Sequence, residues 1–251
     1  MPLYMPFRQR LAPVAIFLFN AAPISNIPTK LLRGEILPDR NLQADRQAIR
    51  DLIESWALWR DAGDWDRLGT LWHKQSRMVA TWFEASGQDF VARSRAAWDS
   101  PTQVLHSLGG ISVEIAENRA VAETRMLITQ RATVHGVIVD VECKGRFWDA
   151  LIKENGEWQL VLRQPIYEMD RMSPVDPSVR LELDKALLAQ FPEGYRNLAY
   201  LQTQLGLKLN LALPGARGAK VNALRDKGRR WLTGLSVPDL LSAHAELSSA
   251  A

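Results

Sequence analysis

The chain is poor in the residues that build covalent or metal-held frameworks. Its 251 residues include one cysteine, Cys143, and four histidines. A single cysteine excludes an intramolecular disulfide and a cysteine-rich metal site, and no His, Cys and Asp cluster has metal-ligand spacing. We therefore expect no metal site. We expect Cys143 to be a small buried hydrophobic residue in a strand.

An excess of charge of one sign is also lacking. The chain has 31 Lys and Arg against 28 Asp and Glu, a net charge of +3. A nucleic-acid-binding surface needs a stripe of Lys and Arg on one face, and this small excess does not supply one. We expect no nucleic-acid partner. Apolar residues at 47% and charged residues at 24% are ordinary for a globular protein, which argues against disorder of the whole chain.

Long hydrophobic runs are absent, so we expect no stable membrane span. The candidate run, residues 11–19, follows Arg8 and Arg10 and is interrupted by Pro13. Residues 1–22 partly resemble a signal peptide, but the small-residue cleavage site is poor. A loosely attached extension is an equally good interpretation. We expect a cytoplasmic protein, with export as the alternative if residues 1–22 act as a signal.

Hydrophobic patterning divides the chain into three parts, residues 1–42, 43–172 and 173–251. The first is an extension that is irregular up to about residue 44. In the second, apolar residues recur at helical spacing from Asp45 to Gly63. Asp64 is placed to cap a second helix from Trp65 to about Trp72. Further elements are expected as a helix at 88–98 and strands at 78–83, 104–115, 120–131, 137–153 and 158–163.

Helices followed by an antiparallel meander predict the α+β class rather than a parallel α/β sheet. Asn155-Gly156 predicts a tight turn between the last two strands. The third part predicts a helical extension, with helices at 181–189, after the turn at 191–195 as far as 205, and at 221–232. Its basic residues are interpreted as a solvated helix face; they are Arg225, Lys227, Arg229 and Arg230.

Alternation in the 104–115 strand bears on His106. Even positions up to Leu108 and odd positions from Ile111 are apolar, so the pattern changes parity at Gly109-Gly110. A β-bulge there would place both sets on one face. With that bulge His106 joins the interior face, and without it His106 points away from the core.

Three segments together resemble a known family. They are Asp61-Ala-Gly-Asp-Trp-Asp-Arg-Leu68 at the end of the first helix, Val104-Leu-His-Ser-Leu-Gly in the strand, and Gly145-Arg-Phe-Trp-Asp149 before Asn155-Gly-Glu-Trp158. Over residues 43–172 the chain resembles SnoaL-like proteins of the nuclear transport factor 2-like superfamily, in the dehydratase-like branch. The resemblance implies a cone-shaped fold, in which a strongly curved, mostly antiparallel sheet wraps around the N-terminal helices and encloses an apolar pocket. We also expect a homo-oligomer, a dimer or a trimer.

The resemblance implies a catalytic pair at Asp61 and His106, with no cofactor. In the dehydratase-like branch an Asp orients a His, which removes a proton next to an activating group. Imidazole has an ordinary pKa of about 6.5 and can accept and return a proton near neutrality. On the helix, Arg60 lies near the centre of the apolar stripe and Asp61 roughly 100° from it. Asp61 therefore reaches a pocket only from the edge of the helix, and a solvated helix-end acid is an equal interpretation.

The chain departs from those dehydratases at two places. Arg60 stands where some of them have a tyrosine before the aspartate. The strand after the histidine offers Thr129, Gln130 and Arg131 rather than a second acid or base. A single Asp–His pair still suits elimination or isomerisation.

Three further residues are candidates for substrate binding: Arg146, Trp56 and Tyr167. Arg146 lies among aromatic residues and can bind an anion, or it can pair with Asp149 or Asp170, which is the interpretation we favour. Most of the tryptophans are expected to pack in the core or at interfaces, but Trp56, if it lines the pocket, would favour a flat or polycyclic ligand. Tyr167 can supply a hydroxyl if it faces inward. His73, at the end of the second helix, is expected to be exposed or to cap that helix.

The sequence thus predicts a lyase or isomerase that acts without a cofactor on a small hydrophobic, possibly polycyclic, molecule. A non-catalytic ligand-binding or assembly module with the same fold is the first alternative. A subunit of a larger oxygenase is the second. Removing His106 separates the enzyme from the module.

Overall fold

A computed structural model describes residues 38–242 of the chain. The signal-like segment expected at residues 1–22 and His244 lie outside the described residues. The expected domain limits at residues 43 and 172 stay predictions, and two elements cross them, as the bounds below show.

Three N-terminal helices precede the sheet: α1 (Pro38–Ala62), α2 (Trp65–Thr70) and α3 (Gly87–Ala96). The apolar stripe of α1 is buried, with Ile49, Ile53 and Trp56 fully inaccessible. Gly63 follows α1 with a φ of +72°, a conformation that favours glycine. The side chain of Asp64 accepts a hydrogen bond from the Arg67 backbone, which confirms the expected cap. Helix α1 begins earlier than predicted, because residues 38–44 are helical rather than irregular.

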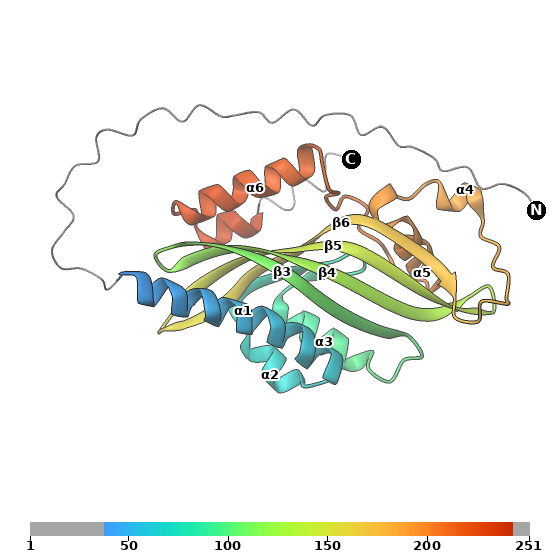
Figure 1. Ribbon diagram of the computed structural model, residues 1–251, viewed down its shortest axis with the longest axis horizontal. Coiled ribbons are helices and arrows are strands. Elements are labelled where there is room, and N and C mark those ends of the chain that lie inside the picture. Colours follow the sequence, from blue (N-terminus) through green and yellow to red (C-terminus); the bar gives the residue numbers. More distant parts are fainter. Residues whose placement is uncertain (1–37, 243–251) are drawn as a thin grey trace, which may run out of the picture. The chain divides into compact units, whose positions relative to one another are not determined.

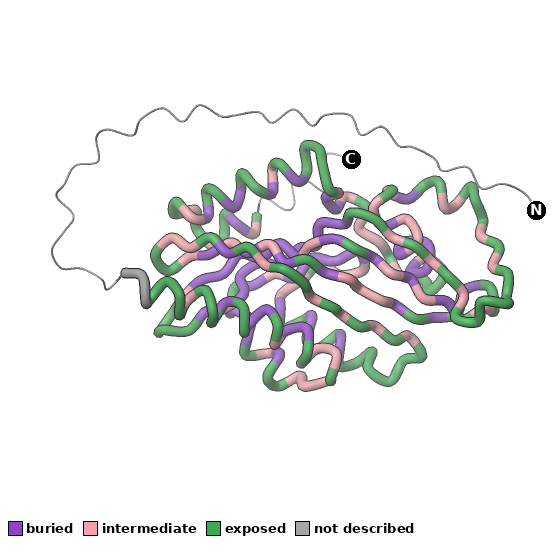
Figure 2. Tube along the Cα trace, viewed as in Figure 1, coloured by how far each residue is buried: buried purple, intermediate pink, exposed green. Residues whose placement is uncertain are grey.

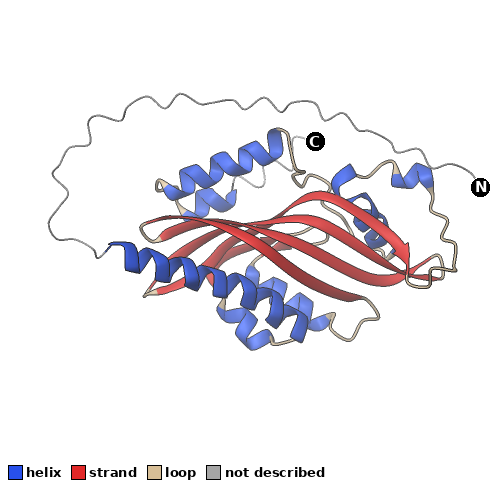
Figure 3. Cartoon of the chain, in the orientation of Figure 1, coloured by secondary structure: helices blue, strands red, loops and turns tan. Residues whose placement is uncertain are grey.

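The six strands form one sheet in the order β2-β1-β6-β5-β4-β3. They are β1 (Trp72–Val79), β2 (Glu84–Ala85), β3 (Gln103–Ala116), β4 (Arg119–Val134), β5 (Val137–Glu154) and β6 (Glu157–Pro174). All neighbouring pairs are antiparallel except β1 and β6, which run parallel. The α+β class with a curved, mostly antiparallel sheet is confirmed (Figure 3). The sheet is open, with β2 and β3 as its edges, so it is not a closed barrel.

Two elements differ from the expected pattern. The strand predicted at residues 78–83 begins at Trp72, because α2 already ends at Thr70. His73 therefore lies in β1 with 2% of its surface exposed, and the expected exposed or capping role is wrong. The last strand runs to Pro174 instead of residue 163. It stays paired with β5 across two irregularities that the hydrophobic pattern does not reveal.

The C-terminal part contributes α4 (Lys185–Leu188), the short 3₁₀ turn η1 (Glu193–Tyr195), α5 (Arg196–Gln204) and α6 (Ala219–Leu232). Helix α4 is much shorter than the helix expected at 181–189. In Figure 1, α1 to α3 and α6 lie on opposite sides of the sheet. Gly228 of α6 packs on the Trp148 ring of β5. Lys227 is buried under α6, which corrects its place in a solvated face.

Burial alternates along β5 from Val139 to Phe147 and so defines the two faces of the sheet there, whereas residues 147–152 are all buried. Figure 2 shows buried residues gathered where the sheet meets the helices. Cys143 and Phe147 belong to the inner face. The Cys143 thiol lies 3.9 Å from the Gly194 carbonyl of η1. As expected, Cys143 is a small buried residue in a strand. The inner face is therefore covered by the N-terminal helices over one part and by η1 and α5 over another.

Candidate functional site

The bulge predicted in the His106 strand is present. Leu108 pairs with Met126 and Ile111 with Thr124, so β3 carries one residue more than β4 between these pairs. The extra residue lies at Gly109-Gly110 and reverses the alternation of β3. His106 consequently shares the inner face with Val113, and its side chain is 7% exposed. The prediction that a bulge at this point turns His106 inward is confirmed.

Helix α1 lies along the free edge of β3 and satisfies backbone groups that no strand pairs. The Asp61 carboxylate accepts a hydrogen bond from the His106 backbone N–H, at 2.5 Å. The Arg60 guanidinium donates to the Val104 carbonyl at 3.2 Å, and Arg46 donates to the Val113 carbonyl at 2.5 Å. An unpaired strand edge exposes a row of donors and acceptors, and these three side chains each bind one of them.

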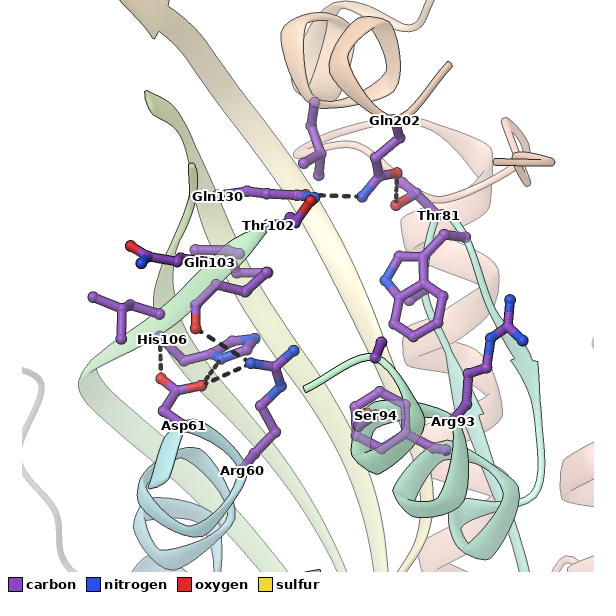
Figure 4. Close-up of a pocket in the computed structure, with 18 of the residues that line it drawn as sticks. Arg60, Asp61, Thr81, Arg93, Ser94, Thr102, Gln103, His106, Gln130 and Gln202 are labelled. Atoms are coloured by element: carbon purple, nitrogen blue, oxygen red, sulfur yellow. Dashed lines mark hydrogen bonds and ion pairs between the residues drawn. The ribbon is translucent and has the colours of Figure 1, made fainter. Parts of the chain in front are cut away.

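Asp61 also contacts the imidazole of the residue whose backbone it binds. Its Oδ1 lies 2.8 Å from His106 Nδ1, while Oδ2 accepts from the His106 backbone. An ionised carboxylate only accepts hydrogen bonds, so Nδ1 carries the proton and Nε2 is left without one. Figure 4 shows Asp61 at the end of its helix, directed at both groups of His106. The two residues that the sequence paired are thus brought together.

Burial sets the protonation state of His106. Desolvation lowers its pKa below the ordinary 6.5, and Arg60 and Arg163 act in the same direction. The hydrogen bond and negative charge of Asp61 raise the pKa and offset part of this effect. His106 is therefore a neutral imidazole at neutral pH, with Nε2 able to accept a proton.

Two aromatic rings pack against the imidazole of His106. Trp56 meets His106 edge to face, with ring centres 5.3 Å apart, and Phe147 lies at 6.2 Å. The Arg163 guanidinium stacks on the same two rings, 4.3 Å from Trp56 and 4.6 Å from Phe147. It binds Asp149 with two hydrogen bonds of 2.7 and 2.8 Å, and both side chains are fully buried. Trp56, Phe147, Arg163 and Asp149 therefore form a tightly packed layer against which the His106 ring lies, here called the floor.

A cavity of about 920 Å³ opens above this floor. His106, Arg60 and Asp61 lie together at one end of it (Figure 4). Apolar side chains from the helices, the sheet and the C-terminal part line it: Trp56, Phe90, Ile128, Phe147, Pro165 and Leu198. The volume suits a small organic molecule.

The other end of the cavity is polar and is built partly by the C-terminal segment. Gln202 of α5 accepts from the Thr81 hydroxyl at 2.6 Å and donates to Gln130 of β4 at 3.2 Å (Figure 4). Gln130, one of the residues noted in place of a second acid or base, thus has an amide partner. Tyr167 also lines the cavity, and burial raises the pKa of its hydroxyl well above the ordinary value. Tyr167 is therefore a neutral donor facing inward.

Arg146 does not belong to this cavity. It lies on the opposite face of β5 from Phe147, because neighbouring residues of a strand point to opposite faces. Its guanidinium binds Glu123 and, at 2.7 Å, Glu168. Neither partner is the Asp149 or Asp170 that the sequence suggested. Arg146 holds the outer face, and we do not assign it to ligand binding.

Three cavity residues were missed or undervalued from the sequence. The sequence places Arg60 at the centre of the α1 stripe, where a charge is unusual, but gives no direct sign that it lines a cavity. Thr81 and Gln202 carried no signal, because they are 121 positions apart and only the fold joins them. Within residues 38–242, no group of three or more His, Cys, Asp or Glu side chains is arranged to hold a metal ion. In the same range no helix has the length and hydropathy of a membrane span.

Comparison with known sequences finds relatives along most of the chain. A model of the SnoaL-like domain matches residues 43–164. Pea pathogenicity protein 2 of Fusarium vanettenii is 35% identical over 226 residues, which cover 86% of this chain and 96% of that protein. A PEP2-like protein of the same fungus is 33% identical with the same coverage. The similarity therefore extends beyond the SnoaL-like domain into the C-terminal helices.

Solved structures with a related fold are more distant in sequence. A hexachlorocyclohexane dehydrochlorinase, LinA type 3 of Novosphingobium barchaimii, is 14% identical with a TM-score of 0.45, covering 58% of this chain and 99% of that chain. A proposed scytalone dehydratase of Novosphingobium aromaticivorans is 20% identical with a TM-score of 0.46, covering 58% of this chain and 100% of that chain. These likenesses concern the fold alone.

Proposed function

The chain has a SnoaL-like domain and belongs to the family of pea pathogenicity protein 2, and from this premise we propose that it is a lyase or isomerase that needs no cofactor. Its substrate is a small hydrophobic molecule held in the cavity. His106 is the general base and Asp61 the residue that orients it. The observation that carries the proposal is the 2.8 Å contact between Asp61 Oδ1 and His106 Nδ1 at the end of an apolar cavity.

The proposed chemistry follows from the tautomer of His106. With Nδ1–H bound to Asp61, Nε2 takes a proton from a carbon of the substrate. The carboxylate stabilises the imidazolium that forms. Returning the proton to another carbon completes an isomerisation, and giving it to a leaving group completes an elimination. Both reactions need one group that first accepts a proton from the substrate and then donates it.

A panel assay tests the proposal. Small hydrophobic alcohols, halides and unsaturated ketones are incubated with the protein in D₂O, and NMR follows elimination and incorporation of solvent deuterium. We expect turnover of at least one class by the unmodified protein and a loss of roughly 10²–10⁴-fold in His106→Ala. Circular dichroism checks that this variant is folded. Equal turnover by the variant, or ligand binding with no turnover by either protein, would favour the non-catalytic module.

Self-association and location form a separate part of the proposal. We propose a homo-oligomer, a dimer or trimer, in the cytoplasm. Leu58 of α1 and Leu105 of β3, 69% and 60% exposed, supply apolar surface that self-association would cover. Light scattering on the purified chain tests the oligomer, and a monomer at all concentrations would exclude it. Export with cleavage near residue 22 would exclude the cytoplasmic location.

A further inference from the structure

Arg60 has more hydrogen-bond donors than the protein uses. Its Nη1 donates to the Val104 carbonyl at 3.2 Å and to Asp61 at 3.3 Å. Among the described residues, its buried Nε has no partner. Figure 4 shows the other terminal nitrogen directed away from Asp61, toward the space between His106 and Ser94. The side chain is only 14% exposed and lines the cavity. Because Nε is itself buried, the second terminal nitrogen is the donor that can reach a ligand there.

The charges around the cavity leave room for a negative group. Arg60, Asp61 and Arg93 are the charged residues of its lining, apart from His106, which is neutral. The carboxylate of Asp61 is already engaged by both groups of His106. In the floor, the positive charge of Arg163 is compensated by the carboxylate of Asp149. Arg60 shares the one carboxylate of the cavity lining, that of Asp61, with His106. A guanidinium with a terminal nitrogen left over is stabilised by an incoming oxygen that carries negative charge.

We propose that Arg60 binds the carbonyl oxygen of the substrate and stabilises the enolate that forms when His106 removes the neighbouring proton. The substrate class is then an enolisable ketone or related carbonyl compound, rather than a simple alcohol or halide. This inference rests on the proposed function of His106. Donors placed where charge develops in the transition state are among the strongest contributions to such reactions.

An elimination proceeds through the enolate. His106 Nε2 takes the α-proton, and the electron pair of that C–H bond forms the C=C bond of the enolate while the oxygen becomes negative beside Arg60. The carbonyl then re-forms, the electron pair makes the bond between the α- and β-carbons, and the β-hydroxyl leaves. It takes the proton from Nε2 and departs as water. For an isomerisation, the same proton returns to the γ-carbon of a β,γ-unsaturated ketone.

A purely structural role for Arg60 is the competing interpretation, since its Nη1 also holds the edge of β3. Arg46 provides a matched control. It comes from the same helix and donates to a β3 carbonyl, that of Val113, but it does not line the cavity. Replacing Arg46 tests the loss of an edge contact alone.

The test uses two small aromatic probes. The first is 4-nitrophenol, whose ionised form mimics an enolate and absorbs at a different wavelength from the neutral form. The second is nitrobenzene, which carries no charge. Both are titrated into the full chain and into Arg60→Gln, Arg60→Lys, Arg46→Gln and His106→Gln. We expect the unmodified protein to bind the phenolate and to lower the pKa of the bound dye. Arg60→Gln should lose at least about tenfold in phenolate affinity while nitrobenzene binding is kept. Arg60→Lys should recover part of the loss, and Arg46→Gln should bind as the unmodified protein does.

Equal phenolate binding by Arg60→Gln, equal loss of both probes, or no phenolate binding by the unmodified protein would each overturn the inference. A different result, obtained with His106→Gln, would refute the proposed function. Phenolate binding does not need a base, so His106→Gln should keep it even though its turnover is lost. Turnover that survives in His106→Gln would show that His106 is not the base. The phenolate titration would still test the oxyanion site at Arg60, because it does not depend on turnover.

Discussion

The carboxylate of Asp61 holds His106 at two points, the backbone N–H at 2.5 Å and the ring Nδ1 at 2.8 Å. One contact fixes where the strand lies against α1, and the other fixes the tautomer of the imidazole. Position and chemistry of the base therefore depend on the same side chain. An acid near the C-terminal end of a helix opposes the helix dipole, and Arg60 and the His106 donors offset that cost.

Replacing Asp61 by Asn should remove the chemistry while keeping the fold. The amide oxygen can still accept from the His106 backbone, but its NH₂ group then faces Nδ1 and favours the tautomer with the proton on Nε2. We expect kcat to fall by roughly 10²–10⁴-fold with little change in melting temperature. Steady-state kinetics and thermal unfolding measure the two effects. Full activity in a folded Asp61→Asn protein would show that Asp61 does not orient the base.

The buried pair Asp149–Arg163 should be the most sensitive ion pair of the sheet. Asp149→Asn leaves the Arg163 charge uncompensated between two aromatic rings, and we expect the free energy of unfolding to fall by about 3–5 kcal/mol. Glu142→Gln is the matched control, because Glu142 and Arg171 form the same two-bonded pair across the same strands on the surface. Denaturant titration of both variants should show a much smaller loss for the control. Equal losses would contradict the account of the floor.

The contact of Gln202 should fix α5 to the sheet. Gln202→Ala leaves the Thr81 hydroxyl and the Gln130 amide without their partner, and we expect a loss of about 1–3 kcal/mol in the free energy of unfolding. Hydrogen exchange in α5 should become faster. Thr203→Ala is the control, since Thr203 donates only to its own helix, at Ala199. Unchanged exchange in α5 of Gln202→Ala would show that other contacts hold this end of the cavity.

Lys227 should make stability depend on pH under alkaline conditions. Burial lowers its pKa from 10.5 to about 8, and its Nζ has no hydrogen-bond partner among the described residues. The unfolded chain therefore binds more protons between pH 8 and 10.5, so stability rises with pH across this window and is lower below it. Lys227→Met should remove the effect and raise stability at neutral pH by on the order of 3 kcal/mol. A pH series of unfolding curves measures this, and an unchanged series in the variant would contradict it.

Some of the site could be predicted from local pattern. The parity change around Gly109-Gly110 predicted the bulge and the inward His106, since alternation is a property of the strand alone. The same alternation, applied to Cys143 and Phe147, places Arg146 on the outer face. There it forms ion pairs, as the favoured interpretation expected, but with Glu123 and Glu168 rather than Asp149 or Asp170. The contact of the Asp61 carboxylate with His106 could not be predicted from helix geometry. It depends on how α1 lies along the edge of β3, which is a tertiary contact.

Other features needed the fold itself. Helix α2 ends at Thr70, sooner than its hydrophobic pattern indicates, so β1 begins early and buries His73. The polar end of the cavity joins Thr81, Gln130 and Gln202 from three elements far apart in the chain. Side chains that meet only after folding leave no periodic signal, whereas the helices and the meander do.

The central claim is that Asp61 holds His106 as a neutral imidazole with Nε2 free to accept a proton. Nitrogen NMR of the labelled protein measures this directly, with His106→Gln identifying the resonances. We predict that Nδ1 carries the proton at pH 7 and that His106 titrates below pH 6.5, since burial lowers its pKa. A proton on Nε2 at pH 7, or a titration at or above pH 6.5, would contradict the account.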